Sequence, residues 1–139
     1  MTTVISPELS KKNKYHIPKH RYYELKHFCL QYNDWKKAYS EIEYLRSSTY
    51  DNAIFRREDE ISNPTYELAE QKLLYFEKMK VIEQTAIATD PELSSYILKA
   101  VTNEFTYVHL KSKLNIPCGR GTYYDRYRRF FWLLDKAKY

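Results

Sequence analysis

The chain has 139 residues and a net charge of +5, with 43% hydrophobic and 29% charged residues. This length fits one compact domain, and the apolar fraction supports a core, which excludes a disordered polypeptide. No apolar run approaches the roughly 18 residues of a membrane span, and the amino-terminal residues lack the apolar segment of a signal peptide. We therefore expect a soluble, cytoplasmic protein that does not bind membranes. Cys29 and Cys118 lie far apart and outside any C-x-x-C motif, so we expect two free thiols.

Charge is distributed unevenly along the chain. Residues 1–26 hold six lysines and arginines against two carboxylates, and residues 111–139 hold eight against two. The residues between them carry a net charge of −5. Basic ends around an acidic centre are typical of a phosphate-binding surface combined with a separate packing or partner region.

The pattern of apolar residues predicts an all-α fold, a helical bundle. Two glycines and five prolines leave few turn signals, and apolar residues recur mainly at spacings of three and four. We expect a flexible basic arm over residues 1–17 and a single helical domain over residues 18–139. A first helix follows Pro18, and Asn33 or Asp34 can cap a second. The apolar stripes of these helices are Tyr22, Leu25, Phe28, Cys29 and Tyr32, and then Trp35, Ala38, Tyr39, Ile42 and Leu45.

The middle of the chain predicts a long connection and then a long helix. Residues 47–63 interrupt the helical pattern with small polar residues and a charge cluster. Asn63 and Pro64 then supply a cap and a proline for the first helical position. The stripe that follows is wide enough for an intramolecular core, which the pattern favours, and long enough for a dimer seam. It consists of Leu68, Tyr75, Met79, Ile82 and Ala86.

The carboxy-terminal third has the order of a helix-turn-helix DNA-binding unit, which we expect over residues 90–139. A capped helix starts at residues 90–92, and Thr106 can cap a short helix. The sequence NIPCGRG breaks that helix, and Thr122 opens a basic helix that runs to about Lys136. The residues expected inside are Ile116 in the turn and Tyr123, Tyr127, Phe130 or Phe131, and Leu134 on the last helix.

The outward face of the last helix is the candidate DNA-reading surface. Gly119 and Gly121 permit the backbone conformations of a short turn, and the helix amino terminus offers amides to phosphate. Arg120 and Arg126 are the candidates for guanine recognition in the major groove. This face is expected to present Arg120, Thr122, Tyr124, Asp125, Arg126 and Arg129. The expected phosphate contacts are Lys111, Lys113, Arg128, Arg129 and Lys136. Alternatively, the helix packs its rings and leaves its arginines solvated, without DNA.

Two segments carry a resemblance to a known family. ELKHFCLQYNDWKKAYSEIE and YVHLKSKLNIPCGRGTYYDRYRRFFWLLDK resemble small phage and prophage proteins of Gram-positive bacteria grouped with the RinA and ArpU late-transcription regulators. The resemblance covers residues 24–43 and 107–136. It implies a DNA-binding regulator of phage gene expression whose reading helix contains Arg120, Thr122, Tyr124 and Arg126.

Metal binding and catalysis are not expected. His16, His20, His27 and Cys29 are close in sequence, but a proline separates the first two and no second ligand pair follows, so no metal or cofactor is predicted. Nucleotide-binding and hydrolase motifs are absent from the sequence, and the carboxylates at 58–60 are explained as a solvated cluster, so we do not expect an enzyme.

The predicted partner is double-stranded DNA, bound by a homodimer, with RNA polymerase or another bacterial protein as a further partner. Two alternatives stay open. The fifteen tyrosines are also typical of a protein interaction module that binds a bacterial regulator or polymerase without touching DNA. The second alternative is a small terminase-like DNA-recognition subunit, which would assemble into rings.

Overall fold

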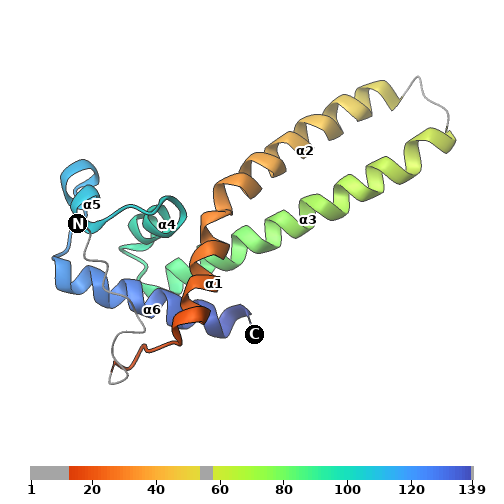
Figure 1. Ribbon diagram of the computed structural model, residues 1–139. Coiled ribbons are helices and arrows are strands. Elements are labelled where there is room, and N and C mark those ends of the chain that lie inside the picture. The colour runs from red at the N-terminus through yellow and green to blue at the C-terminus, as the bar shows by residue number, and fades with distance from the viewer. Residues whose placement is uncertain (1–12, 54–57, 139) are drawn as a thin grey trace. The chain divides into compact units, whose positions relative to one another are not determined.

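The computed structural model describes residues 13–53 and 58–138, with the side chains of 46–53 and 58–65 left out. Over these ranges the chain is helical and contains no strand, which confirms the all-α prediction (Figure 1). The helices are α1 (Lys19–Leu30), α2 (Tyr32–Ala53), α3 (Glu58–Thr89), α4 (Ser94–Asn103), α5 (Tyr107–Leu114) and α6 (Arg120–Lys138). Among the described helices, none combines the length and hydropathy that a membrane crossing requires.

The described residues divide into two compact units. One combines the residues up to Gln31 with those from Val81 onward, and we call it the core unit. The other is Tyr32–Lys80, which we call the hairpin unit. The end of α3 thus belongs to the core unit and the rest of that helix to the hairpin unit.

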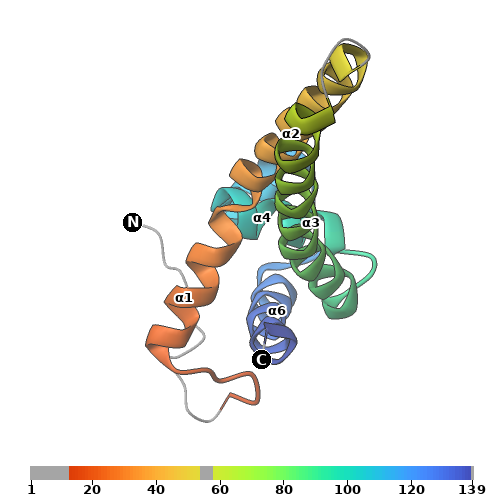
Figure 2. The same cartoon turned by 90° about the vertical axis from the view of Figure 1, so that its right-hand side faces the viewer.

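In the hairpin unit, α2 and α3 run side by side as an antiparallel pair (Figures 1 and 2). Glu43 of α2 and Lys72 of α3 form an ion pair, with 2.7 Å between Oε1 and Nζ. The ring centroids of Tyr39 and Phe76 lie 6.4 Å apart across the pair. The described side chains that are buried in this unit are Tyr32, Trp35, Ile42 and Met79.

Several helix boundaries in the hairpin unit differ from the sequence prediction. Because α2 begins at Tyr32, Asn33 and Asp34 lie in its first turn and not at a cap, where the carboxylate of Asp34 suits the positive end of the helix macrodipole. The predicted connection is wrong for residues 47–53 and 58–63, which are helical, while 54–57 lie outside the described residues. Polar residues of low helix propensity weaken a helix by only about a few tenths of a kcal/mol each, which does not end it.

The start of α3 was also predicted wrongly. The helix begins at Glu58, so Pro64 lies inside it and not at its first position, and one helical hydrogen bond is missing there. The acidic run at 58–60 occupies the amino terminus, where acidic residues favour helix formation.

The interior of the core unit is formed by side chains from α1, α4 and α6. Helix α1 packs against α4 and α6, and α4 also packs against α5 and α6. The predicted inner faces of α1 and α6 are confirmed by the buried side chains Tyr22, Leu25 and Cys29 on α1 and Tyr123, Phe130, Phe131 and Leu134 on α6. On α4 the buried apolar side chains are Ile97, Ala100 and Val101.

Polar contacts also join α1 to α6. The hydroxyls of Tyr22 and Tyr127 lie 2.6 Å apart, and Arg21 Nε donates to Asp135 Oδ1 at 2.6 Å. Burial, reinforced by the neighbouring Tyr22, raises the pKa of Tyr127 well above its ordinary value, so the Tyr127 hydroxyl is protonated at neutral pH. Burial likewise raises the pKa of the Cys29 thiol, and the prediction of free cysteines is confirmed.

The segment that precedes α1 contributes to the same core. Tyr15 and Ile17 are buried, and the Tyr15 ring centroid lies 5.4 Å from that of Trp132 on α6. Residues 13–17 of the expected arm therefore belong to the folded unit, whereas 1–12 lie outside the described residues.

Candidate nucleic-acid interface

The short helix α5 and the turn after it form as the sequence predicts. Thr106 caps α5, since its hydroxyl accepts a hydrogen bond from the His109 amide at 3.2 Å. The helix ends at Leu114, and its C-cap residue Asn115 has a left-handed backbone with φ of 54°. Ile116 follows and is fully buried, and its amide donates to the Leu110 carbonyl at 3.1 Å. The predicted cap and the predicted apolar plug of the turn are both confirmed.

The two glycines have a different role from the one predicted. Neither Gly119 nor Gly121 has a positive φ, and the left-handed position of the turn is taken by Asn115, a residue type that tolerates it. Helix α6 begins at Arg120, two residues before Thr122, so Gly121 lies in its first turn. A Cβ added at either glycine would meet no atom within 4 Å. The described fold therefore does not require glycine at these positions; it leaves an uncovered backbone at the start of α6.

Arg126 is held by the protein's own carboxylates. Its Nε donates to Asp90 Oδ2 at 3.0 Å, and its Nη1 pairs with Asp125. Asp90 also caps the turn before α4, because its Oδ1 accepts the amides of Glu92 and Leu93 at 3.0 and 3.2 Å. Partial desolvation opposes ionisation of Asp90, but the hydrogen bonds from Arg126 and the two amides outweigh it and lower the pKa of the carboxyl. Arg126 thus fixes α6 to the start of α4, and its guanidinium is already occupied.

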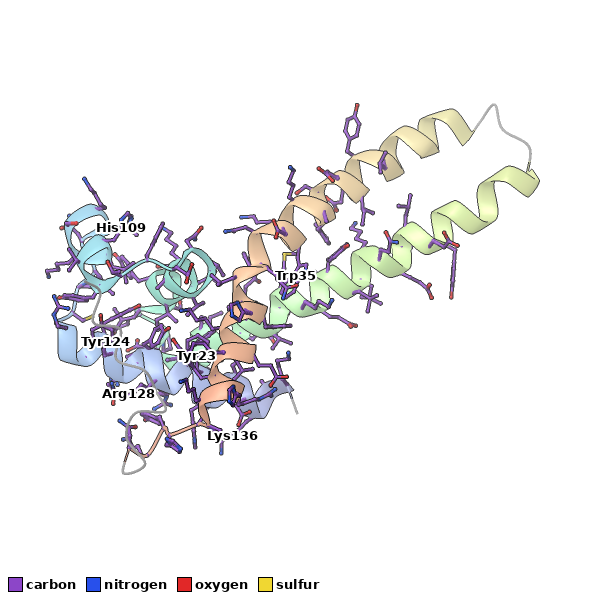
Figure 3. The ribbon with its side chains drawn as sticks, in the orientation of Figure 1. Tyr23, Trp35, His109, Tyr124, Arg128 and Lys136 are labelled. Atoms are coloured by element: carbon purple, nitrogen blue, oxygen red, sulfur yellow. The ribbon has the colours of Figure 1, made fainter. Side chains whose placement is uncertain are left out.

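The prediction that Tyr124 faces outward is wrong. Its side chain is only 8% exposed, and its ring centroid lies 5.1 Å from that of Tyr123 (Figure 3). Tyr124 is spaced three residues from Tyr127 and seven from Phe131, so it belongs to the inner stripe of the helix. This spacing was visible in the sequence and would have placed the residue correctly.

The remaining cations of α5 and the first half of α6 lack acidic partners. No ion pair among the described residues involves Lys111, Lys113, Arg120, Arg128 or Arg129. Lys111, Lys113, Arg120 and Thr122 are exposed. Arg128, which projects from α6 in Figure 3, and Arg129 are half-buried, and their Nε atoms are buried without a hydrogen-bond partner in the described part of the chain. A buried donor without an acceptor is unfavourable, and a buried Nε atom is itself out of reach of a bound phosphate.

The cations of α5 and of the α6 amino terminus are brought together around the turn. The Arg120 guanidinium lies 5.1 Å from the Tyr107 ring centroid, and Lys111 Nζ reaches the Ile116 carbonyl at 3.4 Å. Lys136 is separate from this group, since 16 residues of helix put it about 24 Å along the axis from Arg120. Its Nζ lies 3.9 Å from the ring centroid of Trp132.

The described residues were also compared with the requirements of a metal site. Within residues 13–53 and 58–138, no group of three histidines, cysteines or carboxylates is placed to hold a metal ion. The chain matches no family model, and no curated protein or solved structure is detectably similar to it. Membership of the RinA and ArpU group stays a prediction from the residue patterns.

Proposed function

We propose that the protein is a phage-type transcriptional regulator that binds double-stranded DNA in the cytoplasm through α5 and the first half of α6. The observation that carries this proposal is a group of five cations on α5 and the first half of α6 that form no ion pair with a carboxylate among the described residues: Lys111, Lys113, Arg120, Arg128 and Arg129. The same region keeps Arg126 paired with Asp90, so the lack of partners is not a general property of its arginines.

The helix order supports a helix-turn-helix mode of binding. Helix α4 packs against both α5 and α6, and Ile116 fills the turn between the last two helices. In such units the first residues of the last helix approach the base edges, and the flanking residues contact phosphate. We assign base contacts to Arg120 and Thr122, and phosphate contacts to Lys111, Lys113 and Arg129.

Glycine at the start of α6 fits this proposal. Gly119 and Gly121 leave the backbone amides of the first turn uncovered, and such amides bind phosphate where no side chain blocks the approach. Arg126, whose guanidinium is occupied by Asp90 and Asp125, acts on DNA binding through the position of α6.

The test is fluorescence anisotropy of the full chain with labelled genomic DNA fragments across a salt series. The informative variant is Arg120→Gln/Arg129→Gln, and the matched control is Lys36→Gln/Lys37→Gln, which removes two exposed charges from α2. We expect the first variant to lose roughly tenfold or more in affinity and to reduce the salt slope by about two, because two phosphate or base contacts are removed. The control is expected to bind like the parent protein.

Two results would contradict the proposal. One is the absence of binding at low salt, and the other is an equal loss in both variants, which would indicate binding by net charge alone. Light scattering on the same samples separates a dimer from the large rings of a terminase-like subunit.

A protein interaction role is the second candidate, supported by the surface of the hairpin unit. Tyr44, Tyr66, Leu73 and Leu74 are 75%, 65%, 56% and 55% exposed, and exposed apolar side chains in such number are typical of partner contacts. A second copy of the chain or RNA polymerase is the partner we propose for this surface. This role is compatible with DNA binding by the core unit.

A further inference from the structure

We propose that the core unit contains a binding site for a small planar aromatic anion, in a cavity between α1, α4, α5 and α6. The cavity has a volume of about 700 Å³. Small-molecule sites typically enclose about 300 to 1,000 Å³, with mostly apolar and aromatic walls and a few polar groups that orient the ligand. This cavity has both features, and Arg120 is the one lining residue to which a DNA contact is also assigned.

The walls of the cavity are flat aromatic rings. They are provided by Tyr107, Tyr123, Tyr124, Tyr127 and Phe131, with Val101 of α4 completing the apolar surface. The ring centroids of Tyr107 and Tyr123 lie 5.7 Å apart and those of Tyr123 and Tyr124 5.1 Å apart. Aromatic rings at mixed angles favour a planar ligand, which can stack on one ring and meet the edge of another.

Two of the tyrosines that line this cavity have hydroxyls without a hydrogen-bond partner among the described residues. Tyr123 and Tyr124 are 2% and 8% exposed, and neither hydroxyl makes a hydrogen bond among the described residues. The other two tyrosines of the cavity make hydrogen bonds within the protein. The Tyr107 hydroxyl donates to the Cys118 carbonyl, and the Tyr127 hydroxyl is hydrogen-bonded to that of Tyr22. Burial raises the pKa of Tyr123, so its hydroxyl is a donor at neutral pH. Two hydroxyls of lining tyrosines are therefore left for an acceptor on a ligand.

The charges at the cavity favour one negative group. Lys26 Nζ lies 3.5 Å from Glu104 Oε1, so these two lining residues neutralise each other. Arg120 also lines the cavity and has no carboxylate partner among the described residues. A guanidinium binds a carboxylate or a phosphate with two parallel hydrogen bonds. A ligand with one aromatic ring system and one carboxylate or phosphate therefore matches the aromatic walls, the two unpartnered hydroxyls and the charge of Arg120.

The test is isothermal titration calorimetry of the full chain, without DNA, with three probes. 2-Naphthoate represents aromatic carboxylates, adenosine monophosphate represents aromatic phosphates, and 2-naphthalenemethanol is the neutral counterpart. We expect at least one anion to bind at one site per chain, and the neutral probe to bind roughly tenfold more weakly or not at all. Binding of only one anion identifies which acceptor group the site takes.

Variants locate the site. Tyr123→Phe and Tyr124→Phe remove one hydroxyl each and keep the ring, and Arg120→Gln removes the cation. We expect Tyr123→Phe and Tyr124→Phe each to weaken binding of the anion roughly tenfold, because each deletes one hydrogen bond to a charged group. Arg120→Gln is expected to weaken it more, because it removes a charge and two hydrogen bonds. Lys99→Gln, which removes an exposed cation from α4 outside the cavity, is expected to have no effect.

The proposal is overturned if neither anion binds with saturation at millimolar concentration. It is also overturned if an anion binds equally well to the parent protein and to all three cavity variants, with thermal unfolding showing that the variants are folded. Because DNA is absent from the titration, neither outcome depends on whether the protein is a DNA-binding regulator.

Discussion

The core unit and the hairpin unit differ in how fully they bury their large apolar side chains. In the core unit the rings of Tyr22, Tyr123, Phe130 and Phe131 are at most 2% exposed. In the described part of the hairpin unit, six large apolar side chains are 44% to 75% exposed, namely Tyr44, Leu45, Tyr66, Leu73, Leu74 and Phe76. The core unit is thus specified by its own packing, whereas the helices of the hairpin unit carry apolar surface that their mutual contact does not cover.

The long apolar stripe of α3 shows this difference within a single helix. Ile82 and Ala86 of the core unit are buried, as is Met79 at the adjoining end of the hairpin unit, which confirms the intramolecular core for this part of the stripe. Leu68 and Tyr75, earlier in the same stripe, are only half-buried. A two-helix hairpin has too little interior to bury a stripe on every turn, so a dimer seam stays a prediction for the earlier part.

The largest expected contrast comes from the same substitution in the two units. Leu134→Ala removes a fully buried side chain from the core unit, and we expect the free energy of unfolding to fall by about 2 to 5 kcal/mol. Leu73→Ala removes a side chain that is 56% exposed, and the expected loss is below about 1 kcal/mol. Urea denaturation followed by circular dichroism measures both. Equal losses would show that Leu73 is buried in solution, and a dependence on protein concentration would then identify a second copy as the cover.

The buried residues of the core unit were predicted well from the sequence because they recur with the periodicity of single helices. The stripes on α1 and α6 follow the three- and four-residue spacing of a helix, so their buried residues can be read without knowing their neighbours. Helix ends were predicted less well. Proline at 64 and the polar residues at 47–53 are weak signals for a helix end, since packing and neighbouring turns can extend a helix through them.

The candidate DNA surface was predicted only in part, for two physical reasons. The partner of Arg126 is Asp90, 36 positions earlier in the sequence, and such a tertiary ion pair leaves no local pattern. The left-handed position of the turn is taken by Asn115 and not by a glycine, because asparagine also tolerates this conformation. The positions of the glycines in the sequence do not indicate this. The exposed cations of α5 needed no tertiary information, since they lie opposite the apolar residues of a short helix.

Two ion pairs allow a further comparison of the units by double-mutant cycles. Asp90 and Arg126 join two helices of the core unit with 19% and 34% of their side chains exposed, and Glu43 and Lys72 join the hairpin with 52% and 22% exposed. We expect a coupling free energy of about 1 kcal/mol for the first pair, because Asp90 is also held by backbone amides. For the second we expect about 0.5 kcal/mol or less, because solvent screens it.

The coupling of Asp90 to Arg126 is also expected to depend on pH. The folded-state pKa of Asp90 lies below its ordinary value of 3.8, so its contribution is complete above that pH and is lost as the pH falls through the lower, folded value. Cycles repeated at neutral pH and near pH 3 measure this loss. A coupling that is unchanged by acid, or equal in the two pairs, would contradict a special role for Asp90 as both cap and ion-pair partner.

The smallest expected effect on stability concerns Gly121, which lies in the first turn of α6. Gly121→Ala places a Cβ in open space on a residue with ordinary helical φ, so we expect a gain of about 0.4 to 1 kcal/mol in the free energy of unfolding. The same methyl group would stand between the first-turn amides and a phosphate, so DNA affinity is expected to fall while stability rises. Ser40→Ala on the exposed surface of α2 is the control, since it favours the helix of the other unit and leaves DNA binding alone. Greater stability with unchanged DNA affinity would show that this glycine serves neither the fold nor the approach of DNA, and the contact would then depend on the side chains of α5 and α6 alone.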